Sequence, residues 1–563
     1  MKKWQIYRQE PTRSQQLANE LKISPLTAQI LINRGLDNAK DAEKFLNPRL
    51  SDLKDPFEIP QMSNATRRIL LARERGEKVT IYGDYDVDGV TGTVILLQSL
   101  KYLGINCDYY IPHRYGEGYS LNQAAIQKIK AEGAHLLLTV DCGIASKIEI
   151  ELANSLGMEV IVTDHHNLPG ELPAAYAIVN PKLIPHPHPS QQLSGAGVAF
   201  KFAWALLRSA GISEHDFLTG LLDLVALGTI ADVVPLTGEN RILSVQGLNL
   251  INQRKRLGIK YLAEAASLNG KITISNVNFA LAPRLNAAGR LEHASLAVKL
   301  LTSSDPDEAR ESAKALNQIN YRRQGIGGDI QEEVFSKIQF KEEQKIVFAS
   351  GENWHPGVIG IVASRVVDTY YRPAVLIGIN EGIGRGSARS IDGFNIFALL
   401  DSCRDLFLDF GGHEGAAGFE IDPVNIPELK RRLIDKIEAE LTSEILVAKL
   451  SIDAELSSPQ ITLGLIKELE SLSPYGQGNP APLFLTRNLT PTDIRQVGGD
   501  GSHLKIKFMD GRSTLEVIGF RLGELAKNLA FNKTYDITYN LESNEWNGFE
   551  SAQLNLVDIK EAI

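Results

Sequence analysis

Short hydrophobic runs and amphipathic stretches alternate along residues 65–163. The hydrophobic runs cover residues 78–82, 107–111, 135–140 and 159–163, and helical periodicity separates them at residues 94–103, 121–132 and 147–156. Strands that alternate with helices at this spacing predict a doubly wound parallel sheet. Ligands of such sheets bind beyond the carboxyl ends of the strands. Functional side chains are therefore expected directly after the predicted strands.

The pattern predicts a second α/β domain and a long helix that leads into it. Residues 1–60 form a helical lead-in, and the first α/β domain then covers residues 61–303. Ser304, Asp305 and Pro306 are typical of a helix start and predict a connecting helix over residues 304–340. Glycines at 325, 327 and 328 are expected to weaken or kink this helix. Residues 341–450 restart the α/β pattern, with strands expected at 345–349 and 374–379.

The last part of the chain has a different pattern. Residues 451–563 alternate hydrophobic and polar positions over segments 504–508, 515–520, 535–541 and 553–559, with an Asp510-Gly511 turn after the first of them. This alternation predicts an all-β domain, and a small barrel of the kind that binds oligonucleotides fits it best.

Composition excludes several classes of protein. The chain of 563 residues is 43% hydrophobic and 23% charged, and its 59 basic and 68 acidic residues give a net charge of −9. No apolar run approaches the ~20 residues of a membrane helix, and the N-terminal MKKWQIYRQEPTR lacks the apolar core of a signal peptide. Three widely spaced cysteines argue against a disulfide framework. We expect a cytoplasmic protein without a membrane partner.

Acidic and imidazole groups follow four of the predicted segments. They occur in the run Gly83–Gly89 (GDYDVDG), at Asp141, at Asp164-His165-His166 and at Asp232. Carboxylates gathered in one crevice repel one another unless cations neutralise them. Oxygen and imidazole ligands suit Mn²⁺ or Mg²⁺, and the histidine favours Mn²⁺. Two ions that share a bridging aspartate and activate a water for attack on phosphorus are the simplest interpretation.

Other interpretations of these residues have less support from the sequence. Asp84, Asp86, Asp88 and Gly89 match the opening of a calcium loop, but Ile95 stands where that loop needs glutamate. Asp141 alone would be a helix cap, and the residues Thr91–Thr93 suit a phosphate site at a helix N-terminus or a simple cap. Gly195 and Gly197 lack the third glycine of a dinucleotide fingerprint.

The ordered motifs resemble the DHH phosphoesterase superfamily. They are YGDYDVDGVTGT at 82–93, TVDCG at 139–143, DHH at 164–166 and ADVVPL at 231–236. SGAGVAFKF at 194–202, LAPRLNAAGRL at 281–291, NWHPGVIGIVASR at 353–365, GRGSARS at 384–390 and FGGHEGAAG at 410–418 resemble the RecJ family of single-strand-specific exonucleases. The resemblance covers nearly the whole chain. It implies a DHH domain, a DHHA1 domain and a barrel similar to an OB fold.

The resemblance also implies roles for individual residues. It places Asp84, Asp86, Asp88, Asp141, His165 and Asp232 around two divalent cations, with Asp141 as the bridge. His166 would face the scissile phosphate, and Asp164 would orient a metal-bound histidine by fixing its other nitrogen. Phosphate or strand contacts are expected from Arg114, Arg284, Asn286, Arg290, Ser387, Arg389, Gly412 and His413. Without the resemblance, Arg114 is an ordinary surface residue, Gly412 a turn, and the 284–290 segment a structural helix cap.

The function implied by the resemblance is metal-dependent digestion of single-stranded DNA. Nucleotides would leave from the 5′ end as the strand threads between the two α/β domains, during repair or recombination. A single-strand-binding protein or a helicase would be natural partners. Two alternatives stay open: a phosphodiesterase for short oligonucleotides, and a catalytically silent replication scaffold. Every acidic and histidine motif position is filled, which favours an enzyme.

Overall fold

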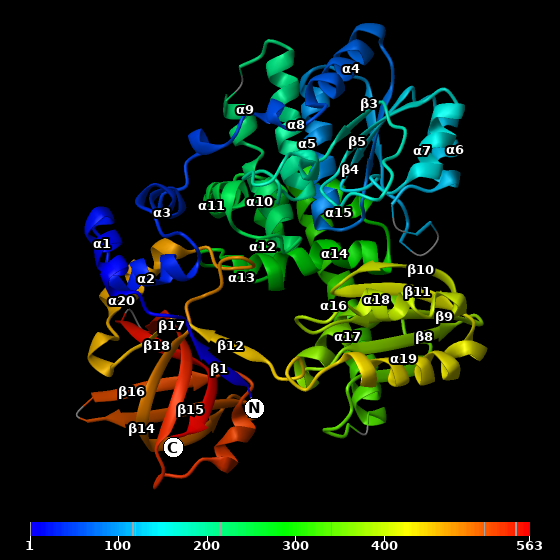
Figure 1. The fold of residues 1–563 in the computed structure, drawn as a ribbon. Helices are drawn as coiled ribbons and strands as arrows, with labels where there is room; N and C mark the ends of the chain where they lie inside the picture. Colours follow the sequence, from blue (N-terminus) through cyan, green and yellow to red (C-terminus); the bar gives the residue numbers. More distant parts are fainter. Residues whose placement is uncertain are drawn as a thin grey trace. The chain divides into compact units, whose positions relative to one another are not determined.

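The computed structural model describes residues 2–562 except 115, 116, 119, 214, 339, 512, 547 and 548. The chain forms two compact units, which are described separately. The larger unit contains Trp4–Leu285, Ala294–Ala313 and Ser451–Ile563, and the smaller unit contains Met1–Lys3, Asn286–His293 and Lys314–Leu450. The larger unit holds a parallel sheet and a β-barrel, and the smaller unit holds a second sheet (Figure 1).

A parallel sheet forms the centre of the first α/β part, as the sequence predicts. Its strands lie in the order β3 (Cys107–Tyr110), β2 (Val79–Gly83), β4 (Leu136–Val140), β5 (Glu159–Thr163) and β6 (Ala177–Val179). All neighbouring strands run parallel. Every residue of β2 and β4 is buried, as expected for strands covered on both faces. The strand order reverses at β2, so the crevice beyond β2 and β4 is the topological switch point.

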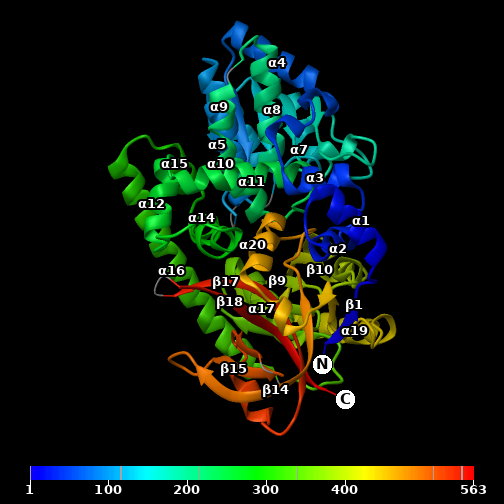
Figure 2. The same cartoon turned by 90° about the vertical axis from the view of Figure 1, so that its left-hand side faces the viewer.

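Helices cover both faces of this sheet (Figure 1). On one face, α6 (Gln123–Ala131) and α7 (Lys147–Ser155) share a core with β2, β4 and β5. On the other face, Gly92 of α5 (Val87–Tyr102) approaches Val140 of β4, and a Cβ at Gly92 would lie 2.6 Å from Val140 Cγ2. Helices α4 (Met62–Arg75), α8 (Gly195–Ser209), α10 (Leu222–Ala231) and α11 (Gly238–Gln253) extend this layer. Figure 2 shows α5, α8 and α10 side by side.

Shorter helices lead from this layer to the connecting helix. They are α12 (Leu257–Ala265), α13 (Ile274–Asn276), the π-helical turn Val277–Leu281, α14 (Ala282–Leu291) and α15 (Ser295–Thr302), whereas the short helix α9 (His215–Thr219) lies between α8 and α10. The connecting helix α16 (Pro306–Lys337) then runs for 32 residues without interruption. The helix therefore continues through its glycines, where the sequence predicts that it is weakened or kinked. One reason is that Gly327 packs against α17, where a Cβ would lie 3.2 Å from Val358 Cγ1.

The smaller unit is built on a mixed sheet. Its strands lie in the order β10 (Phe407–His413), β11 (Ala416–Ile421), β9 (Ile383–Arg389), β8 (Ala374–Asn380) and β7 (Val347–Glu352). Only the β7 and β8 pair is parallel. Helix α17 (Pro356–Tyr370) and the end of α16 share a core with one face. Helices α18 (Ile396–Asp401) and α19 (Ile426–Glu440) share a core with the other.

The C-terminal part is a closed barrel. Its strands follow the order β14 (Phe484–Val497), β15 (His503–Asp510), β16 (Ser513–Gly519), β18 (Phe549–Glu561) and β17 (Tyr535–Trp546), and β17 pairs again with β14. The short strand β13 (Ala454–Glu455) pairs in parallel with β14, and helix α20 (Leu463–Leu469) lies between the two in the chain. A two-stranded ribbon of β1 (Lys3–Ile6) and β12 (Lys449–Ile452) lies at the start of this part.

The N-terminal helices belong to the core of this barrel. Leu17 of α1 (Pro11–Leu21), Ile30 of α2 (Pro25–Asn33) and Phe45 of α3 (Ala39–Leu46) share one hydrophobic cluster with Phe484 and Tyr539. The sequence predicts the helices but does not predict this packing, because their partners lie more than 400 residues further along the chain.

Candidate active site

The loop after β2 places three aspartates at the switch point. Asp86 is the N-cap of α5, and its Oδ1 accepts hydrogen bonds from the backbone N–H groups of Asp88 at 2.9 Å and Gly89 at 3.1 Å. The Asp84 carboxylate is buried beside it. The helix start therefore fixes the carboxylates of this loop at the end of the strand.

Asp88 is fixed by a second helix. Its Oδ2 accepts a hydrogen bond from the Gly195 N–H at 2.5 Å, and its Oδ1 accepts one from the Ala196 N–H at 2.9 Å. Both donors belong to the first turn of α8, where unpaired N–H groups attract negative charge. The sequence does not predict this contact. Its only signal is Ser194, the N-cap that marks where α8 begins.

The other three motifs converge on the same crevice. His165 Nε2 lies 3.0 Å from Asp141 Oδ1, 3.6 Å from Asp232 Oδ2 and 3.9 Å from Asp88 Oδ2. Asp141 follows β4, His165 follows β5, and Asp232 ends α10. Asp141 adopts a φ of 62°, a left-handed conformation that is uncommon outside glycine. Gly195 leaves room for it, because a Cβ there would lie 2.6 Å from Asp141 Cβ.

Asp164 orients His166. Its Oδ1 lies 2.8 Å from His166 Nδ1 and accepts hydrogen bonds from the backbone N–H groups of His165 and His166, and its Oδ2 accepts one from Ile144. Burial of the His166 ring acts to lower its pKa, but the hydrogen bond and charge of Asp164, together with the charges of Asp84 and Asp86, outweigh burial and raise the pKa. A raised pKa favours the cationic imidazolium at neutral pH.

The electrostatics of the crevice indicate cations. Burial, with repulsion from neighbouring carboxylates, raises the pKa of Asp84 to about 8, of Asp88 to about 7 and of Asp232 to about 9. The same causes raise the pKa of Asp141 well above its ordinary value. Burial lowers the pKa of His165 to about 3, so its ring is neutral and able to ligate a metal. Bound cations would remove the repulsion.

Unpartnered buried atoms support the same conclusion. Asp84 Oδ1, Asp141 Oδ1, His165 Nε2 and Asp232 Oδ2 are buried and have no hydrogen-bond partner among the described residues. Such atoms are costly unless a ligand or ion satisfies them. Three groups offer ligand atoms within 4.8 Å of one another, namely Asp84, Asp86 and Asp141; Asp88, His165 and Asp232; and Asp141, His165 and His166. Asp141 and His165 each belong to two groups, so the donor set fits adjacent cations.

A polar cluster surrounds the start of α17 in the smaller unit. The Arg290 guanidinium donates to the Gly357 carbonyl at 2.9 Å, and Arg389 donates to Ser387 Oγ at 3.1 Å. Ser387 and Arg389 lie against Gly360, where a Cβ would approach them to 3.0 and 2.9 Å. Two guanidinium groups and a hydroxyl thus lie beside the first turns of a helix, an arrangement that suits a phosphate group.

The remaining predicted residues lie at separate positions. The Arg114 guanidinium lies 4.8 Å from the Tyr85 ring in the loop after β2. Arg284 is buried and donates to the Ala280 carbonyl at 2.8 Å. Asn286 lies on α14. Gly412 and His413 end β10, opposite Ala417 and Ala416 of β11. The structure thus brings Arg290, Ser387 and Arg389 together at α17 and Arg114 to the aspartate loop.

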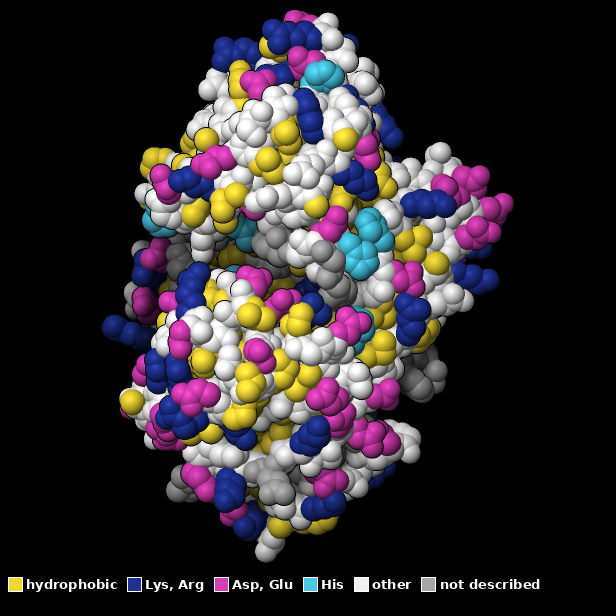
Figure 3. Space-filling model, turned by 90° about the vertical axis from the view of Figure 1, so that its right-hand side faces the viewer, with side chains coloured by type: hydrophobic (Ala, Val, Ile, Leu, Met, Phe, Trp, Pro, Cys, Tyr) yellow, Lys and Arg dark blue, Asp and Glu magenta, His cyan; other side chains and the backbone are white. Residues whose placement is uncertain are grey.

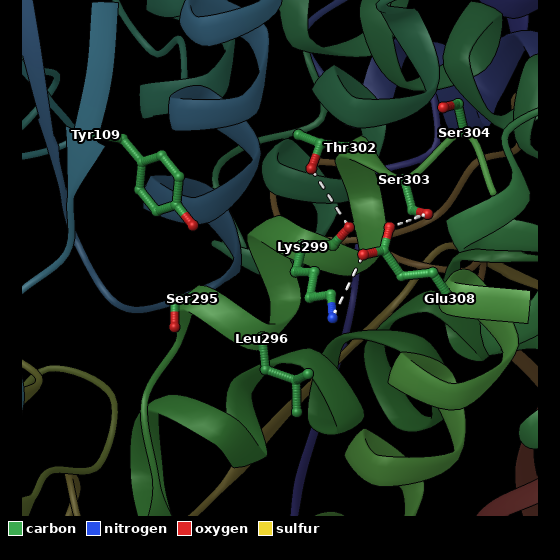
Figure 4. Close-up of a pocket in the computed structure, with 8 residues that line it drawn as sticks. All are labelled: Tyr109, Ser295, Leu296, Lys299, Thr302, Ser303, Ser304 and Glu308. Atoms are coloured by element: carbon green, nitrogen blue, oxygen red, sulfur yellow. Dashed lines mark hydrogen bonds and ion pairs between the residues drawn. The ribbon is translucent and has the colours of Figure 1, made fainter.

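A hollow and the charge pattern of one face complete the description of the surface. A hollow of about 490 Å³ between β3, α15 and the start of α16 is lined by Tyr109, Lys299 and Glu308 among others, and the ion pair of Lys299 with Glu308 lies within it (Figure 4). None of its lining residues belongs to the motifs. On the face in Figure 3, basic and acidic side chains are interspersed.

Curated relatives and solved structures resemble the chain over its whole length. It is 41% identical to the single-stranded-DNA-specific exonuclease RecJ of Bacillus subtilis (strain 168), over 99% of this chain and 70% of the relative. It is 35% identical to the protein of the same name from Escherichia coli (strain K12), over 99% of each. The chain belongs to the RecJ family.

Family matches and a solved structure agree with this assignment. Within this RecJ-family chain, residues 78–229 match the DHH family N-terminal domain, residues 343–440 the DHHA1 domain and residues 452–558 the RecJ OB domain. The crystal structure of RecJ in complex with Mn²⁺ from Thermus thermophilus superposes with a TM-score of 0.87 at 32% identity, covering 100% of this chain and 80% of that chain. The predicted α/β and barrel architecture is confirmed.

The RecJ structures also bear on the metal. A second RecJ structure from Thermus thermophilus, in complex with Mg²⁺, matches with a TM-score of 0.82 at 32% identity, over 100% of this chain and 79% of that one. Divalent cations are therefore the cofactors of this family. In the part of the RecJ-family chain that the structure describes, no helix has the length and apolarity needed to span a membrane.

Proposed function

We propose that this chain is a metal-dependent exonuclease that removes mononucleotides from the 5′ end of single-stranded DNA. The observation that carries the proposal is the set of buried, unpartnered oxygen and nitrogen atoms of Asp84, Asp141, His165 and Asp232 at the switch point. The names and cation complexes of the RecJ relatives support it.

In this proposal, the site binds two divalent cations, Mn²⁺ or Mg²⁺. Asp84, Asp86, Asp88, Asp141, His165 and Asp232 hold the ions, and Asp141 is shared between them; the shared membership of Asp141 in two ligand groups supports this role. When bound, such cations polarise a phosphate and activate a water. The N–H groups of Gly195 and Ala196 keep the Asp88 carboxylate in place for this purpose.

His166 contributes positive charge at the scissile phosphate. Asp164 fixes the orientation of its ring and raises its pKa, as the 2.8 Å contact indicates. An oriented cationic ring stabilises the negative charge that develops on the phosphate oxygens during cleavage. Asp164 is buried and acts through His166, so it is a positioning residue.

The start of α17 holds a phosphate of the strand. Ser387 and Arg389 bind its oxygens directly, and Arg290 reinforces the helix start through Gly357. Arg114, Arg284, Asn286, Gly412 and His413 provide further contacts along the strand. We assign catalysis to segment 61–303, which follows the helical lead-in 1–60. We assign phosphate contacts to segment 341–450, after the connecting helix 304–340, and strand binding to segment 451–563; the matched ranges 78–229, 343–440 and 452–558 support this division.

The proposal extends to partners and to a location in the cell. A single-strand-binding protein or a helicase would present the strand, and affinity capture with purified candidates tests this. A cytoplasmic location is consistent with free thiols at Cys107, Cys142 and Cys403; fractionation of cells tests it.

A single experiment tests the proposed function. Single-stranded oligonucleotides labelled at the 5′ or the 3′ end are incubated with and without Mn²⁺, beside the matching duplex and a dinucleotide. We expect early release of the 5′ label as a mononucleotide, only with metal and only from the single strand. Early release of the 3′ label would contradict the polarity. Consumption of dinucleotides alone would identify a phosphodiesterase for short oligonucleotides, and binding without cleavage would identify a scaffold.

A further inference from the structure

A turn of the C-terminal part contacts the loop that follows Asp232. We call residues 471–479 the 471–479 turn; it lies between α20 and β14. The Leu236 N–H donates to the Gln477 carbonyl at 2.8 Å. The Leu236 side chain is buried, and a Cβ at Gly476 would lie 2.7 Å from its Cδ1. Only three residues separate Leu236 from Asp232, so the turn reaches close to a proposed metal ligand.

Arg241 ties this turn to α11. Its side chain is 2% exposed, and its guanidinium donates to the carbonyls of Leu472 at 3.1 Å, Ser471 at 3.2 Å and Ser473 at 2.9 Å. The same group donates to the Phe45 carbonyl at 2.6 Å and lies 3.7 Å from the Phe45 ring. Burial of a charged group is costly. The carbonyls that satisfy it fix the position of the turn relative to α11.

Hydrogen bonds stabilise both the turn and the loop that it contacts. Asn479 is fully buried, and its Nδ2 donates to the carbonyls of Leu472 at 2.8 Å and Pro474 at 2.9 Å, which closes the turn. On the loop, Asn240 Nδ2 donates to the Pro235 carbonyl at 3.1 Å. Val233 adopts a φ of 60°, which is strained for a β-branched residue. The hydrogen bond from Leu236 to Gln477 adds a contact from outside to this strained loop.

We propose that the 471–479 turn, held by Arg241, positions Asp232 for metal binding through its contact with Leu236. The C-terminal part then has a second role besides binding DNA, because it completes the metal centre. Metal sites require their ligands to be held within about 0.5 Å of the working geometry. This inference rests on the proposed function, which assigns Asp232 as a ligand. Gly476, Leu236 and Arg241 are positioning residues in this scheme.

The test uses the full chain with Gly476→Ala. Gly476 has an ordinary φ, so the added methyl acts through its contact with Leu236 and not through backbone strain. Binding of Mn²⁺ to the DNA-free protein is measured by electron paramagnetic resonance, and binding of single-stranded DNA is measured in EDTA. We expect the dissociation constant of the ion held by Asp232 to rise roughly tenfold, the lower end of what loss of an outer support costs a metal site. DNA affinity should be unchanged.

Gly499→Ala is the matched control. Gly499 lies in an exposed turn of the barrel with no atom within 4 Å of an added Cβ, and its φ is also ordinary. This variant should bind Mn²⁺ and DNA as the parent does. If Gly476→Ala does not fold, Leu236→Ala tests the same contact from the loop side and should weaken Mn²⁺ binding as well.

Further outcomes decide the inference and separate its failure from a failure of the proposed function. Relief of the effect in the Gly476→Ala and Leu236→Ala double variant would establish that the two residues act through one contact. Unchanged Mn²⁺ binding in both single variants, or a loss of DNA affinity alone, would overturn the inference. Normal Mn²⁺ binding by a parent protein that does not digest DNA would refute the proposed function and leave the positioning role standing.

Discussion

Asp141 carries two energetic costs at the residue scale. Its φ of 62° lies in the left-handed region, which costs free energy for any residue except glycine, although aspartate tolerates it better than most. Its carboxylate is buried among other carboxylates, which raises its pKa well above the ordinary value. Stored strain and repulsion at one residue are typical of functional sites. The stability of the metal-free protein should therefore increase when this charge is removed.

Asp141→Asn tests whether the Asp141 charge lowers the stability of the metal-free protein and is required for cleavage. Asparagine tolerates the left-handed φ and removes the charge, so we expect a metal-free protein more stable by about 0.5–2 kcal/mol. Cleavage should be abolished because the shared ligand is lost, while DNA binding stays measurable. Unfolding in EDTA and digestion of labelled oligonucleotides measure the two effects. Asp216→Asn on exposed α9 is the control and should change neither. Full activity in Asp141→Asn would contradict the two-ion site.

The raised carboxyl pKa values predict how stability depends on pH. In the folded, metal-free protein the pKa is about 8 for Asp84 and about 9 for Asp232, against 3.8 for an unperturbed aspartate. The folded state therefore binds more protons than the unfolded state between these values, and its stability falls as pH rises through this range. We expect a lower midpoint of thermal unfolding in EDTA at pH 8.5 than at pH 6.

Added Mn²⁺ should reverse this dependence. Cations bind the ionised carboxylates, so the increase in unfolding midpoint on adding Mn²⁺ should be larger at pH 8.5 than at pH 6. Calorimetry at both pH values measures it. Equal increases at the two pH values would show that the carboxylates do not titrate with the metal.

At the residue scale, the sequence predicts the strand-end motifs but not all their partners. Asp84, Asp141 and Asp164 follow buried strands directly, so the parallel sheet brings them together. The contact of Asp88 with Gly195 and Ala196 depends on how α8 packs on α5, which no local pattern encodes. The sequence predicts that Asp164 orients a histidine, but the structure was needed to show that its partner is His166 Nδ1.

At the element scale, strand prediction succeeds where hydrophobic runs are buried. The predicted segments 78–82, 135–140 and 159–163 coincide closely with β2, β4 and β5. Three-residue β6 is too short to give a pattern, and β9 and β10 are rich in glycine, which has low β propensity. Pairing with neighbouring strands stabilises these segments, so their own sequences do not reveal them.

Helix α16 shows packing overriding propensity, and its glycines give a matched pair of variants. Gly325 is exposed with no atom within 4 Å of an added Cβ, whereas Gly327 is buried against Val358. Gly325→Ala should stabilise the protein by roughly 0.5–1 kcal/mol, because alanine loses less backbone entropy than glycine. Gly327→Ala should raise the free energy of unfolding by less, because its methyl would lie 3.2 Å from Val358 Cγ1. Urea unfolding of both variants measures the difference, and equal gains would contradict the packing.

At the scale of the whole molecule, the two ends of the chain meet in one core. Helices α1–α3 and the barrel strands bury one continuous cluster, although the α/β parts of the chain lie between them in sequence. This arrangement explains why the sequence, read segment by segment, predicts separate N-terminal and C-terminal parts. It also means that the barrel supplies part of the core that buries the N-terminal helices.

Truncation after residue 450 tests whether the N-terminal helices depend on the barrel. Removal of the barrel would uncover Leu17, Ile30 and Leu31, which are now buried, and each such side chain loses about 1.5–3 kcal/mol of burial free energy. We expect hydrogen exchange in residues 11–46 to accelerate strongly, while residues 136–140 stay protected, because the parallel sheet has its own core. Full-length Gly499→Ala should show the parent pattern in both segments. Unchanged protection of residues 11–46 after truncation would show that the N-terminal helices fold without the barrel, and the shared core would then be a contact of two independent parts.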